Sequence, residues 1–393
     1  MTGNRGGCHN SRNTIIVGDT TTVGDMILQA QAKLNLTLEI LGKRPDGYHD
    51  IESVVQSIDL CDRISLKTCP PVRVRRGCEG IDVKVTCNDT SIPRGRGNLV
   101  VDAACALAEF AGLRASMEIN IEKRIPVAAG LGGGSADAAA VLVGLNHLWQ
   151  LGLGASELMA VGERLGADIP FCVKGGTGII RGKGEVVESL PTPEDLWFVV
   201  VTLQDAISTA QAYARFDQLA EISRAYDAGA RNTNVYDTDV CDTSVKATDV
   251  TLRMVQAIRK GRVQDIAEEL TNSLEQAAVV SVPSIVGVKQ TLLAQGAVGA
   301  GMSGSGPTVF GLAVSKAKAE AICNALKRQA SFGVLPDPAS CGKGINAALC
   351  LDAPDEASGN RRLKQTLPYG VSVSGVIKEV FVCQAVPWGV AYT

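Results

Sequence analysis

Histidine is scarce in this chain of 393 residues, which has only His9, His49 and His147. So few histidines leave little room for a multi-histidine metal site, and they argue against a Ser-His-Asp catalytic triad. His147 closes the apolar run that follows a glycine-rich segment, and we interpret it as structural.

No two of the twelve cysteines form a C-x-x-C pair, which excludes a zinc ribbon and a thioredoxin-like motif. Cys69, Cys78 and Cys87 recur every nine residues, a spacing compatible with a metal site. No histidine lies near them, and a polar segment of strand and turn accounts for them better. Scattered cysteines in a chain of this length fit a reducing compartment better than a disulfide framework.

Charge and hydropathy give no indication of a nucleic-acid or membrane partner. The net charge is −3 and the isoelectric point is about 5.8, so no electrostatic attraction to polyanions is expected. The longest apolar run, near Leu196–Leu203, is far shorter than the roughly 20 residues that span a bilayer.

The first 25 residues are polar and contain no apolar core of a secretory signal, so we expect a flexible N-terminus. Arg5, Arg12 and the hydroxyl residues around them faintly resemble a transit peptide, whereas Asp19 argues against one. The predicted location is the cytoplasm, with a plastid as the alternative if this segment is the remnant of a transit peptide.

The most informative segment has four glycines among the five residues Gly130–Gly134, followed at once by Ser135 and an alanine-rich apolar pattern. No Lys-Ser or Lys-Thr follows, so it is not a Walker A loop, and Asp137 rules out G-x-G-x-x-G. Glycines allow close approach to a ligand, and the first N–H groups of a helix form an anion site suited to phosphate. Ser135 could cap the helix or turn its hydroxyl to a metal or a phosphate. The alternative is a tight turn before a buried helix.

Hydrophobic periodicity predicts both strands and helices. The expected strands are Ile27–Ile40, Ile51–Ile64, Met117–Ile125 and Phe198–Leu203, with a hairpin over Val72–Cys87. The expected helices are Asn98–Phe110, Ala136–Leu148, Ser156–Leu165 (capped by Ser156), Thr251–Lys260, Val263–Glu275, Ser284–Gln295 and Lys316–Arg328. They alternate too irregularly for a doubly wound sheet, which favours the α+β class.

We expect four regions along the chain. They are a flexible N-terminus (1–25), an N-terminal domain (26–190), a C-terminal domain (191–330) and an extension without a functional interpretation (331–393). The C-terminal domain carries a polar insertion at 222–250, expected to be flexible, and a second glycine-rich loop at 297–310 that leads into a strand. A short strand is expected within the extension at Val371–Val382.

Two glycine loops, a lysine on a strand and an aspartate before a proline together supply what phosphoryl transfer needs. The segments Ala32–Leu36, Pro126–Ala136 and Gly301–Gly306 resemble the three motifs of the GHMP kinase superfamily. Further blocks at Leu165–Phe171, Ile207–Tyr213 and Asn272–Glu275, and above all Ala32–His49, are similar to 4-diphosphocytidyl-2-C-methyl-D-erythritol kinases of the non-mevalonate isoprenoid pathway. The resemblance covers residues 27–330, and one departure is Gln31, where that family usually has proline.

The resemblance implies a two-lobed fold with the active site in the cleft between the lobes. It also implies ATP-dependent phosphorylation of the 2-hydroxyl of 4-(cytidine 5′-diphospho)-2-C-methyl-D-erythritol, with Mg²⁺. Asp168 would orient or deprotonate that hydroxyl, and Lys33 would keep Asp168 ionised and stabilise the transferring charge. Ser135 would contact the metal.

The remaining implied site residues fall into two groups. The ATP-binding residues would be Pro126, Val127, Ala128, Ala129, Gly130, Leu131, Gly132, Gly133, Gly134, Ser135 and Ala136. The substrate-binding residues would be Asn35 near the methylerythritol hydroxyls, Tyr48, His49 and Tyr213 around the cytosine, and Gly304, Ser305 and Gly306 from the second lobe.

Two alternatives remain at this point. One is another GHMP kinase, of the homoserine or mevalonate type, which would not need the Gly42–His49 block. The other is a non-catalytic ligand sensor, against which Lys33, Asp168 and Ser135 weigh. The expected partner is a small-molecule substrate, with no nucleic acid and no membrane, and the expected assembly is a monomer or a weak homodimer.

Overall fold

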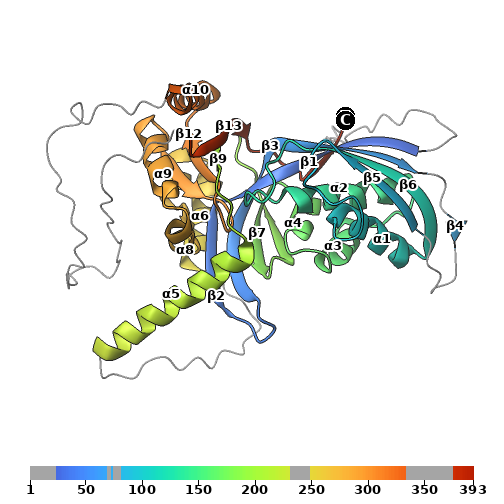
Figure 1. Cartoon of the computed structure of the whole chain (residues 1–393), viewed down its shortest axis with the longest axis horizontal. Coiled ribbons are helices and arrows are strands. Elements are labelled where there is room, and N and C mark those ends of the chain that lie inside the picture. The colour runs from blue at the N-terminus through green and yellow to red at the C-terminus, as the bar shows by residue number, and fades with distance from the viewer. Residues whose placement is uncertain (1–23, 69–71, 74–80, 231–247, 333–374) are drawn as a thin grey trace, which may run out of the picture.

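The chain folds into two lobes, each built on its own β-sheet (Figure 1). The structure is a computed structural model that describes residues 24–68, 72–73, 81–230, 248–332 and 375–393. In these ranges a sheet of ten strands and a sheet of four strands are covered by helices. The α+β class and the two-lobed arrangement are confirmed.

The first lobe is organised around the long strand β3 (His49–Thr68), which is paired with β1 (Gly24–Asn35), β2 (Thr37–Lys43), β6 (Leu113–Glu122) and β7 (Thr177–Gly182). β8 (Val186–Leu190) continues the sheet beyond β7. Residues alternate between the two faces of a strand, and β6 buries one set of side chains while exposing the other.

The predicted hairpin over Val72–Cys87 is wrong. β4 (Val72–Arg73) and β5 (Ile81–Cys87) both pair with β6, the first antiparallel and the second parallel, and not with each other. Alternating residues indicate a strand and its buried face, but they do not specify which neighbour it pairs with. Cys69 and Cys78 of the regular cysteine spacing lie outside the described residues.

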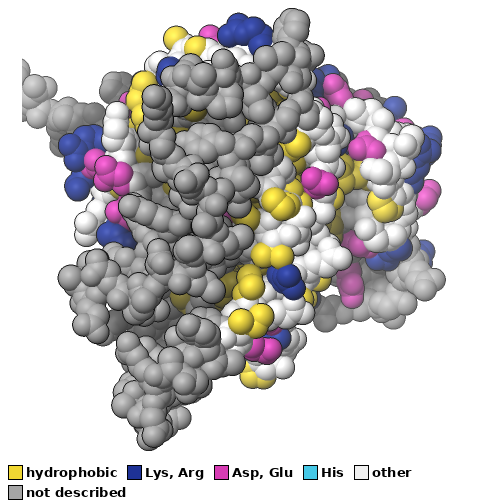
Figure 2. Space-filling view, turned by 60° about the vertical axis from the view of Figure 1, so that its left-hand side comes forward, with side chains coloured by type: hydrophobic (Ala, Val, Ile, Leu, Met, Phe, Trp, Pro, Cys, Tyr) yellow, Lys and Arg dark blue, Asp and Glu magenta, His cyan; other side chains and the backbone are white. Residues whose placement is uncertain are grey.

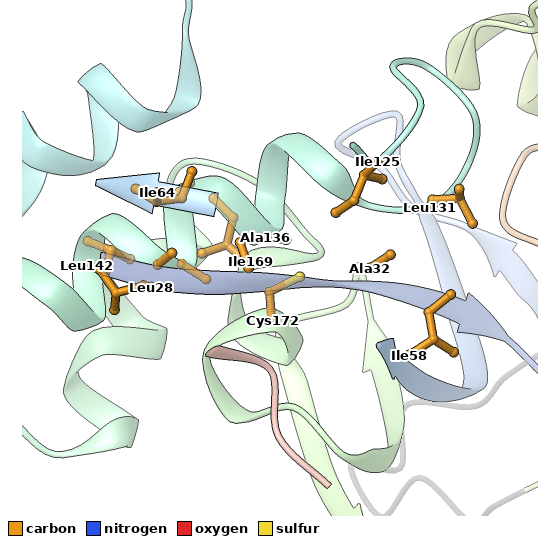
Figure 3. Close-up of a cluster of buried hydrophobic side chains, with 14 of the residues drawn as sticks. Leu28, Ala32, Ile58, Ile64, Ile125, Leu131, Ala136, Leu142, Ile169 and Cys172 are labelled. Carbon is orange, nitrogen blue, oxygen red and sulfur yellow. The ribbon is translucent and has the colours of Figure 1, made fainter. Parts of the chain in front are cut away.

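Four helices cover one face of the first sheet: α1 (Leu99–Ala111), α2 (Gly133–Leu148), α3 (Ala155–Glu163) and α4 (Ile169–Lys174). In Figure 3, Leu28 of β1 lies beside Leu142 of α2, and Cys172 of α4 lies close to the same strand. The near-continuous apolar surface of α2 is thereby buried at the centre of this core.

The predicted cap of α3 is wrong, and of the two roles considered for Ser135 the cap is not observed. Gly132 precedes α2 and Gly154 precedes α3, so Ser135 and Ser156 lie inside the first turns instead of capping them. In both cases a glycine stands just upstream of the serine, and the backbone turns into the helix there. By contrast, Asn98 accepts a hydrogen bond from the amide of Val100, and α1 begins as expected.

The second lobe contains the sheet β11 (Gly299–Met302), β12 (Val309–Ala313), β9 (Trp197–Leu203) and β13 (Ile377–Gln384). Its helices are α5 (Thr209–Ala230), α6 (Asp249–Lys260), α7 (Val263–Glu268), α8 (Glu275–Ser281), α9 (Ser284–Ala294) and α10 (Lys316–Phe332). The predicted single helix over Val263–Glu275 is interrupted by β10 (Thr271–Asn272), which pairs with β2 of the first lobe. Residues 222–230 of the predicted flexible insertion continue α5, and 231–247 lie outside the described residues.

The last described residues belong to both sheets and do not form an appended unit. β13 pairs with β9, and β14 (Val390–Tyr392) pairs with β1. In the segment that links β13 to β14, the carbonyl of Gly389 accepts a hydrogen bond of 3.0 Å from the amide of Gln31. The end of the chain therefore packs beside β1, the strand that carries Lys33. The strand predicted at Val371–Val382 is observed from Ile377 to Gln384, and residues 371–374 are outside the described ranges.

The described surface carries charges of both signs. Figure 2 shows Lys and Arg side chains interspersed with Asp and Glu side chains, in keeping with the small net charge of −3. Among the described helices none alone is long and apolar enough to cross a membrane. The pair α8 and α9 passes that test only together, with a bend of 113° between them, and both helices contribute side chains to the core of the second lobe.

A buried carboxylate joins the strands β3 and β7 and the start of helix α6. Glu52 of β3 is fully buried and pairs with Arg181 of β7 at 2.7 Å. It also accepts hydrogen bonds of 2.7 Å from the amide and the hydroxyl of Thr248, the residue that caps α6. Burial raises the pKa of Glu52, but the hydrogen bonds from Thr248 and Arg181 together lower it by more than burial raises it. The net shift of the pKa is therefore downward.

We therefore expect Glu52→Gln to lower the free energy of unfolding by about 3 kcal/mol at pH 7, because an amide N–H₂ then faces donors in a buried site. The pKa of Glu52 is lower in the folded state than the unfolded value of 4.5. Its contribution to the free energy of unfolding is therefore fully present above pH 4.5 and is lost as the pH falls through the folded pKa. Urea unfolding at pH 7 and below pH 4 measures both effects, and the difference between the two proteins should shrink in acid.

Glu118→Gln is the matched control, since Glu118 is a strand glutamate whose partner Lys84 is 70% exposed. We expect Glu118→Gln to leave the free energy of unfolding nearly unchanged, because an exposed ion pair contributes little. Equal losses in the two variants would contradict the role assigned to Glu52.

Candidate active site

A cavity of about 790 Å³ opens between the two lobes. Segments from both lobes line it: β1, the β2–β3 turn, the glycine loop before α2, the start of α4, the start of α5 and the loop between β11 and β12. The lining includes, among the residues singled out from the sequence, Lys33, Asn35, Tyr48, His49, Pro126 through Ser135, Asp168, Tyr213, Gly304 and Ser305. Ala136 and Gly306 do not line it: Ala136 is buried inside α2, and Gly306 packs behind Gly130.

A lysine and an aspartate meet on one wall of the cavity. Lys33 Nζ lies 3.5 Å from Asp168 Oδ2, and the lysine side chain is only 6% exposed whereas the aspartate side chain is 35% exposed. Lys33 Nζ also donates to Asn35 Oδ1 at 2.7 Å, and Asn35 Nδ2 donates to Ser53 Oγ at 2.8 Å. The ammonium is thereby held in one orientation, and the carboxylate remains accessible to a ligand.

Asp168 stands at the residue before α4, but its side chain makes no capping hydrogen bond there. Pro170 fits the first turn of that helix because proline lacks the N–H that would be unpaired in any case. The carboxylate therefore does not cap its own helix, and among the described residues it forms an ion pair with Lys33.

The glycine loop places the N-terminus of α2 against the cavity. Gly132 has φ +71° and immediately precedes the helix, whose first residues Gly133, Gly134 and Ser135 line the cavity. The Lys33 amide donates to the Leu131 carbonyl at 3.0 Å, which fixes the loop to β1. The unpaired N–H groups at a helix start carry partial positive charge, so this end of α2 suits a phosphate chain.

The loop between β11 and β12 closes onto the glycine loop. Ser303 Oγ donates to the Gly130 carbonyl at 3.1 Å and accepts from the Asn35 amide at 3.3 Å. Asn272 Nδ2 donates to the carbonyls of Met302 and Gly304, at 2.9 Å each. The resemblance pointed to Ser303 and Asn272 only as parts of motifs. The structure shows that the Ser303 side chain joins one lobe to the other, and that the Asn272 side chain holds the second-lobe loop in place.

Aromatic residues gather at the other end of the cavity. The rings of His49 and Tyr213 stack with centroids 4.8 Å apart, and Lys183 Nζ lies 5.2 Å from the centre of the Tyr48 ring, which is 62% exposed. Burial, together with the charge of Asp168, raises the pKa of Tyr213 to about 12, so its phenol stays neutral at physiological pH. These flat faces suit an aromatic ligand such as a nucleobase.

A buried charge cluster beneath the glycine loop was not anticipated from the sequence. Lys123 Nζ pairs with Asp62 and, at 2.9 Å, with Asp137, and all three side chains are at most 6% exposed. Asp62 also accepts from the amides of Arg124 and Ile125 at 2.6 and 2.9 Å. Burial raises the pKa of Asp137 well above its ordinary value despite Lys123. Asp137 and Lys123 flank the glycine run, but only the fold brings Asp62 to them from β3.

Comparisons with known proteins agree with this geometry. The family described as GHMP kinases N terminal domain matches residues 98–176, and GHMP kinases C terminal matches residues 254–331. A 4-diphosphocytidyl-2-C-methyl-D-erythritol kinase of Gloeobacter violaceus is 42% identical over 300 residues, which are 76% of this chain and 89% of that protein. The same enzyme of Pelotomaculum thermopropionicum is also 42% identical, over 76% of this chain and 93% of its own length. The chain belongs to this enzyme family.

Solved structures support the assignment. A crystal structure of 4-(cytidine 5′-diphospho)-2C-methyl-D-erythritol kinase has 31% identity and a TM-score of 0.57, covering 77% of this chain and 96% of its own. A homoserine kinase from Cytophaga hutchinsonii has a TM-score of 0.63 but only 18% identity, over 97% of this chain and 100% of its own, and so shows the fold alone. This member of the 4-diphosphocytidyl-2-C-methyl-D-erythritol kinases is therefore a small-molecule kinase that uses ATP.

The oxygen donors of this kinase's cavity are compatible with Mg²⁺. No group of three or more His, Cys, Asp or Glu side chains among the described residues could hold a metal alone. Ser135 and Asp168 both line the cavity, and Asp137 Oδ1, behind the same helix start, is buried without a partner. Mg²⁺ prefers one or two protein oxygens completed by phosphates and water, and this donor set fits that pattern.

The contact between the two glycine loops gives a direct test. Gly130 has φ +76°, and a Cβ added there would lie 2.5 Å from the Ser303 carbonyl oxygen. We expect Gly130→Ala to lower the free energy of unfolding by about 1–3 kcal/mol, because it combines backbone strain with a backbone clash. Thermal or urea unfolding of the ligand-free protein measures it.

Gly134→Ala is the control within the same loop, because the nearest atom to its added Cβ is Leu99 Cδ1 at 3.6 Å and the residue is helical. We expect unchanged or slightly increased stability. A Gly130→Ala protein as stable as Gly134→Ala would show that the two loops do not meet as described.

Proposed function

We propose that this kinase transfers the γ-phosphoryl group of ATP to the 2-hydroxyl of 4-(cytidine 5′-diphospho)-2-C-methyl-D-erythritol. The observation that carries the proposal is the Lys33–Asp168 pair, which lies beside the N-terminus of α2 in a cavity whose other end is aromatic. The names of the relatives suggest the substrate, and the helix start and the aromatic residues of the cavity support the proposal.

Asp168 is the residue that orients the acceptor hydroxyl and takes its proton as the oxygen attacks the γ-phosphorus. The bond between that phosphorus and the bridging oxygen breaks, and ADP leaves. Lys33, at 3.5 Å from Asp168, stabilises charge on the transferring group. Since Asn35 holds the ammonium at 2.7 Å, this charge needs little reorganisation during the reaction.

The amides of Gly130–Ser135 hold the ATP phosphates, with the rest of the segment from Pro126 to Ala136 shaping and backing that site. Ser135 would help to hold Mg²⁺, which would neutralise charge on the phosphates. The loop with Gly304 and Ser305, supported by Gly306, closes the site from the second lobe.

Tyr48, His49 and Tyr213 enclose the cytosine at the far end of the cavity, and Asn35 lies near the methylerythritol hydroxyls. The aromatic residues and Asp168 line one cavity, which suits a substrate in which a diphosphate links the base to the acceptor alcohol. We further propose that the enzyme acts in the cytoplasm, or in a plastid, as a monomer or a weak homodimer without nucleic-acid or membrane partners.

Replacing the proposed base separates catalysis from binding. We expect Asp168→Asn to lower kcat by about 10²–10⁴-fold, because an amide cannot accept the hydroxyl proton. Binding of ATP should stay within a few-fold of wild type, since the phosphate-binding amides are unchanged. Steady-state ADP release measures the first quantity and calorimetric titration with a non-hydrolysable ATP analogue the second.

Asp102→Asn on α1 serves as the control, because Asp102 faces an exposed arginine and does not line the cavity. It should retain wild-type kcat. Wild-type protein that binds both ligands without turnover, or an Asp168→Asn protein with full activity, would sink the proposed mechanism.

A further inference from the structure

Asp217 of α5 reaches across the cleft to the β2–β3 hairpin of the first lobe. Its Oδ1 lies 2.8 Å from His49 Nε2, and its Oδ2 lies 2.6 Å from Lys43 Nζ. Asp217 is one helical turn after Tyr213, so both side chains project from the same face of α5 toward His49. All four residues line the cavity.

The carboxylate determines which ring nitrogen of His49 carries the proton. An ionised carboxylate can only accept hydrogen bonds, so the nitrogen that faces it must be Nε2–H. Burial raises the pKa of Asp217, but the hydrogen bonds from Lys43 and His49 together lower it by more than burial raises it. The net shift is downward, so the carboxylate is ionised at neutral pH. In a neutral imidazole, Nδ1 then has a lone pair and accepts.

The ring of His49 is also fixed in position. The residue is 8% exposed, its ring stacks on Tyr213, and the ring of Phe216 meets it edge-on at 6.4 Å. Within the described part of the chain no residue hydrogen-bonds Nδ1. Nδ1 is thus the ring nitrogen left for a ligand in the cavity.

We propose that Asp217 is a positioning residue that holds His49 in its Nε2–H tautomer and thereby makes the enzyme select cytosine over uracil. Cytosine presents an amine donor at the position where uracil presents a carbonyl acceptor. A fixed acceptor on the protein pairs with the first and is left unpaired by the second. The inference rests on the proposed function, because it takes the base to lie at His49.

Asp217→Asn should shift this preference toward uracil and not merely weaken binding. Lys43 can only donate, so the amide oxygen of the asparagine turns to Lys43 and its N–H₂ turns to His49 Nε2. Nε2 must then accept, and the proton moves to Nδ1. The ring nitrogen offered to the ligand changes from an acceptor to a donor.

The first arm of the test reads the tautomer without substrate or turnover. The chain has three histidines, so ¹H–¹⁵N correlation spectra of the imidazoles, assigned with a His49→Gln variant, give a resolvable signal for His49. We expect the Nε2–H form in wild type and the Nδ1–H form in Asp217→Asn. A wild-type ring that is Nδ1–H or doubly protonated, or a spectrum that Asp217→Asn leaves unchanged, would overturn the proposal.

The second arm measures binding of CDP and UDP to protein saturated with a non-hydrolysable ATP analogue. We expect the preference of wild type for CDP to fall by about 10–100-fold in Asp217→Asn. With the CDP-linked alcohol, KM should rise and kcat should stay within a few-fold, since the base lies away from the transferring group.

Glu221→Gln is the matched control, an exposed carboxylate one turn further along α5. It should leave the tautomer and the base preference as in wild type. An unchanged CDP preference in Asp217→Asn with a changed tautomer would refute the specificity role. Failure of wild type to phosphorylate any tested alcohol would instead count against the proposed function, because the first arm is independent of catalysis.

Discussion

The close contact between two backbone loops, one from each lobe, is the constraint on which the rest of the site depends. The Gly130 carbonyl accepts from Ser303 Oγ, and the same hydroxyl accepts from the Asn35 amide. That single side chain therefore fixes the glycine loop, the second-lobe loop and the strand that carries Lys33. If the loops moved apart, the helix start that suits phosphate and the Lys33–Asp168 pair would no longer share one cavity. Asn272 supports this arrangement by hydrogen bonds to the second-lobe loop. The C-terminal strands support it by pairing with β1 of the first sheet and β9 of the second.

Charge is distributed along the cavity according to the chemistry of each end. At one end, the amides of α2 and the Lys33 ammonium favour negative charge, and Asp168 is the exposed carboxylate among them. At the other end, neutral aromatic rings lie beside Asp217, whose charge is balanced by Lys43. Beneath the glycine loop, Lys123 is shared by Asp62 and Asp137, which ties β3 to the first turn of α2. Polar groups buried in this way stabilise one geometry only if each has a partner, and most of these have one.

Local features of the sequence predicted much of the fold, and their failures have identifiable causes. The alternation predicted from Met117 is observed as far as Glu122, and the helix predicted over Asn98–Phe110 is confirmed as α1, because both depend on residues close in sequence. The predicted cap at Ser156 is wrong, and Ser135 does not cap α2, because a glycine two or three residues upstream allows the turn earlier. The partner of β5 and the return of β13 and β14 to two different sheets depend on long-range packing, which no local pattern records. The glycine loops are local features and indicated a phosphate site. The roles of Asp62 and Asp217 depend on contacts between distant elements, so the sequence alone did not indicate them.

The most direct test of the central claim is ADP release by the purified protein with Mg-ATP and each of three alcohols. The alcohols are 4-(cytidine 5′-diphospho)-2-C-methyl-D-erythritol, homoserine and mevalonate. The proposed phosphate site at the start of α2 and the proposed base site at His49 and Tyr213 predict release with the cytidine-linked alcohol alone. Release with homoserine or mevalonate at a comparable rate, or with none of the three, would contradict the account.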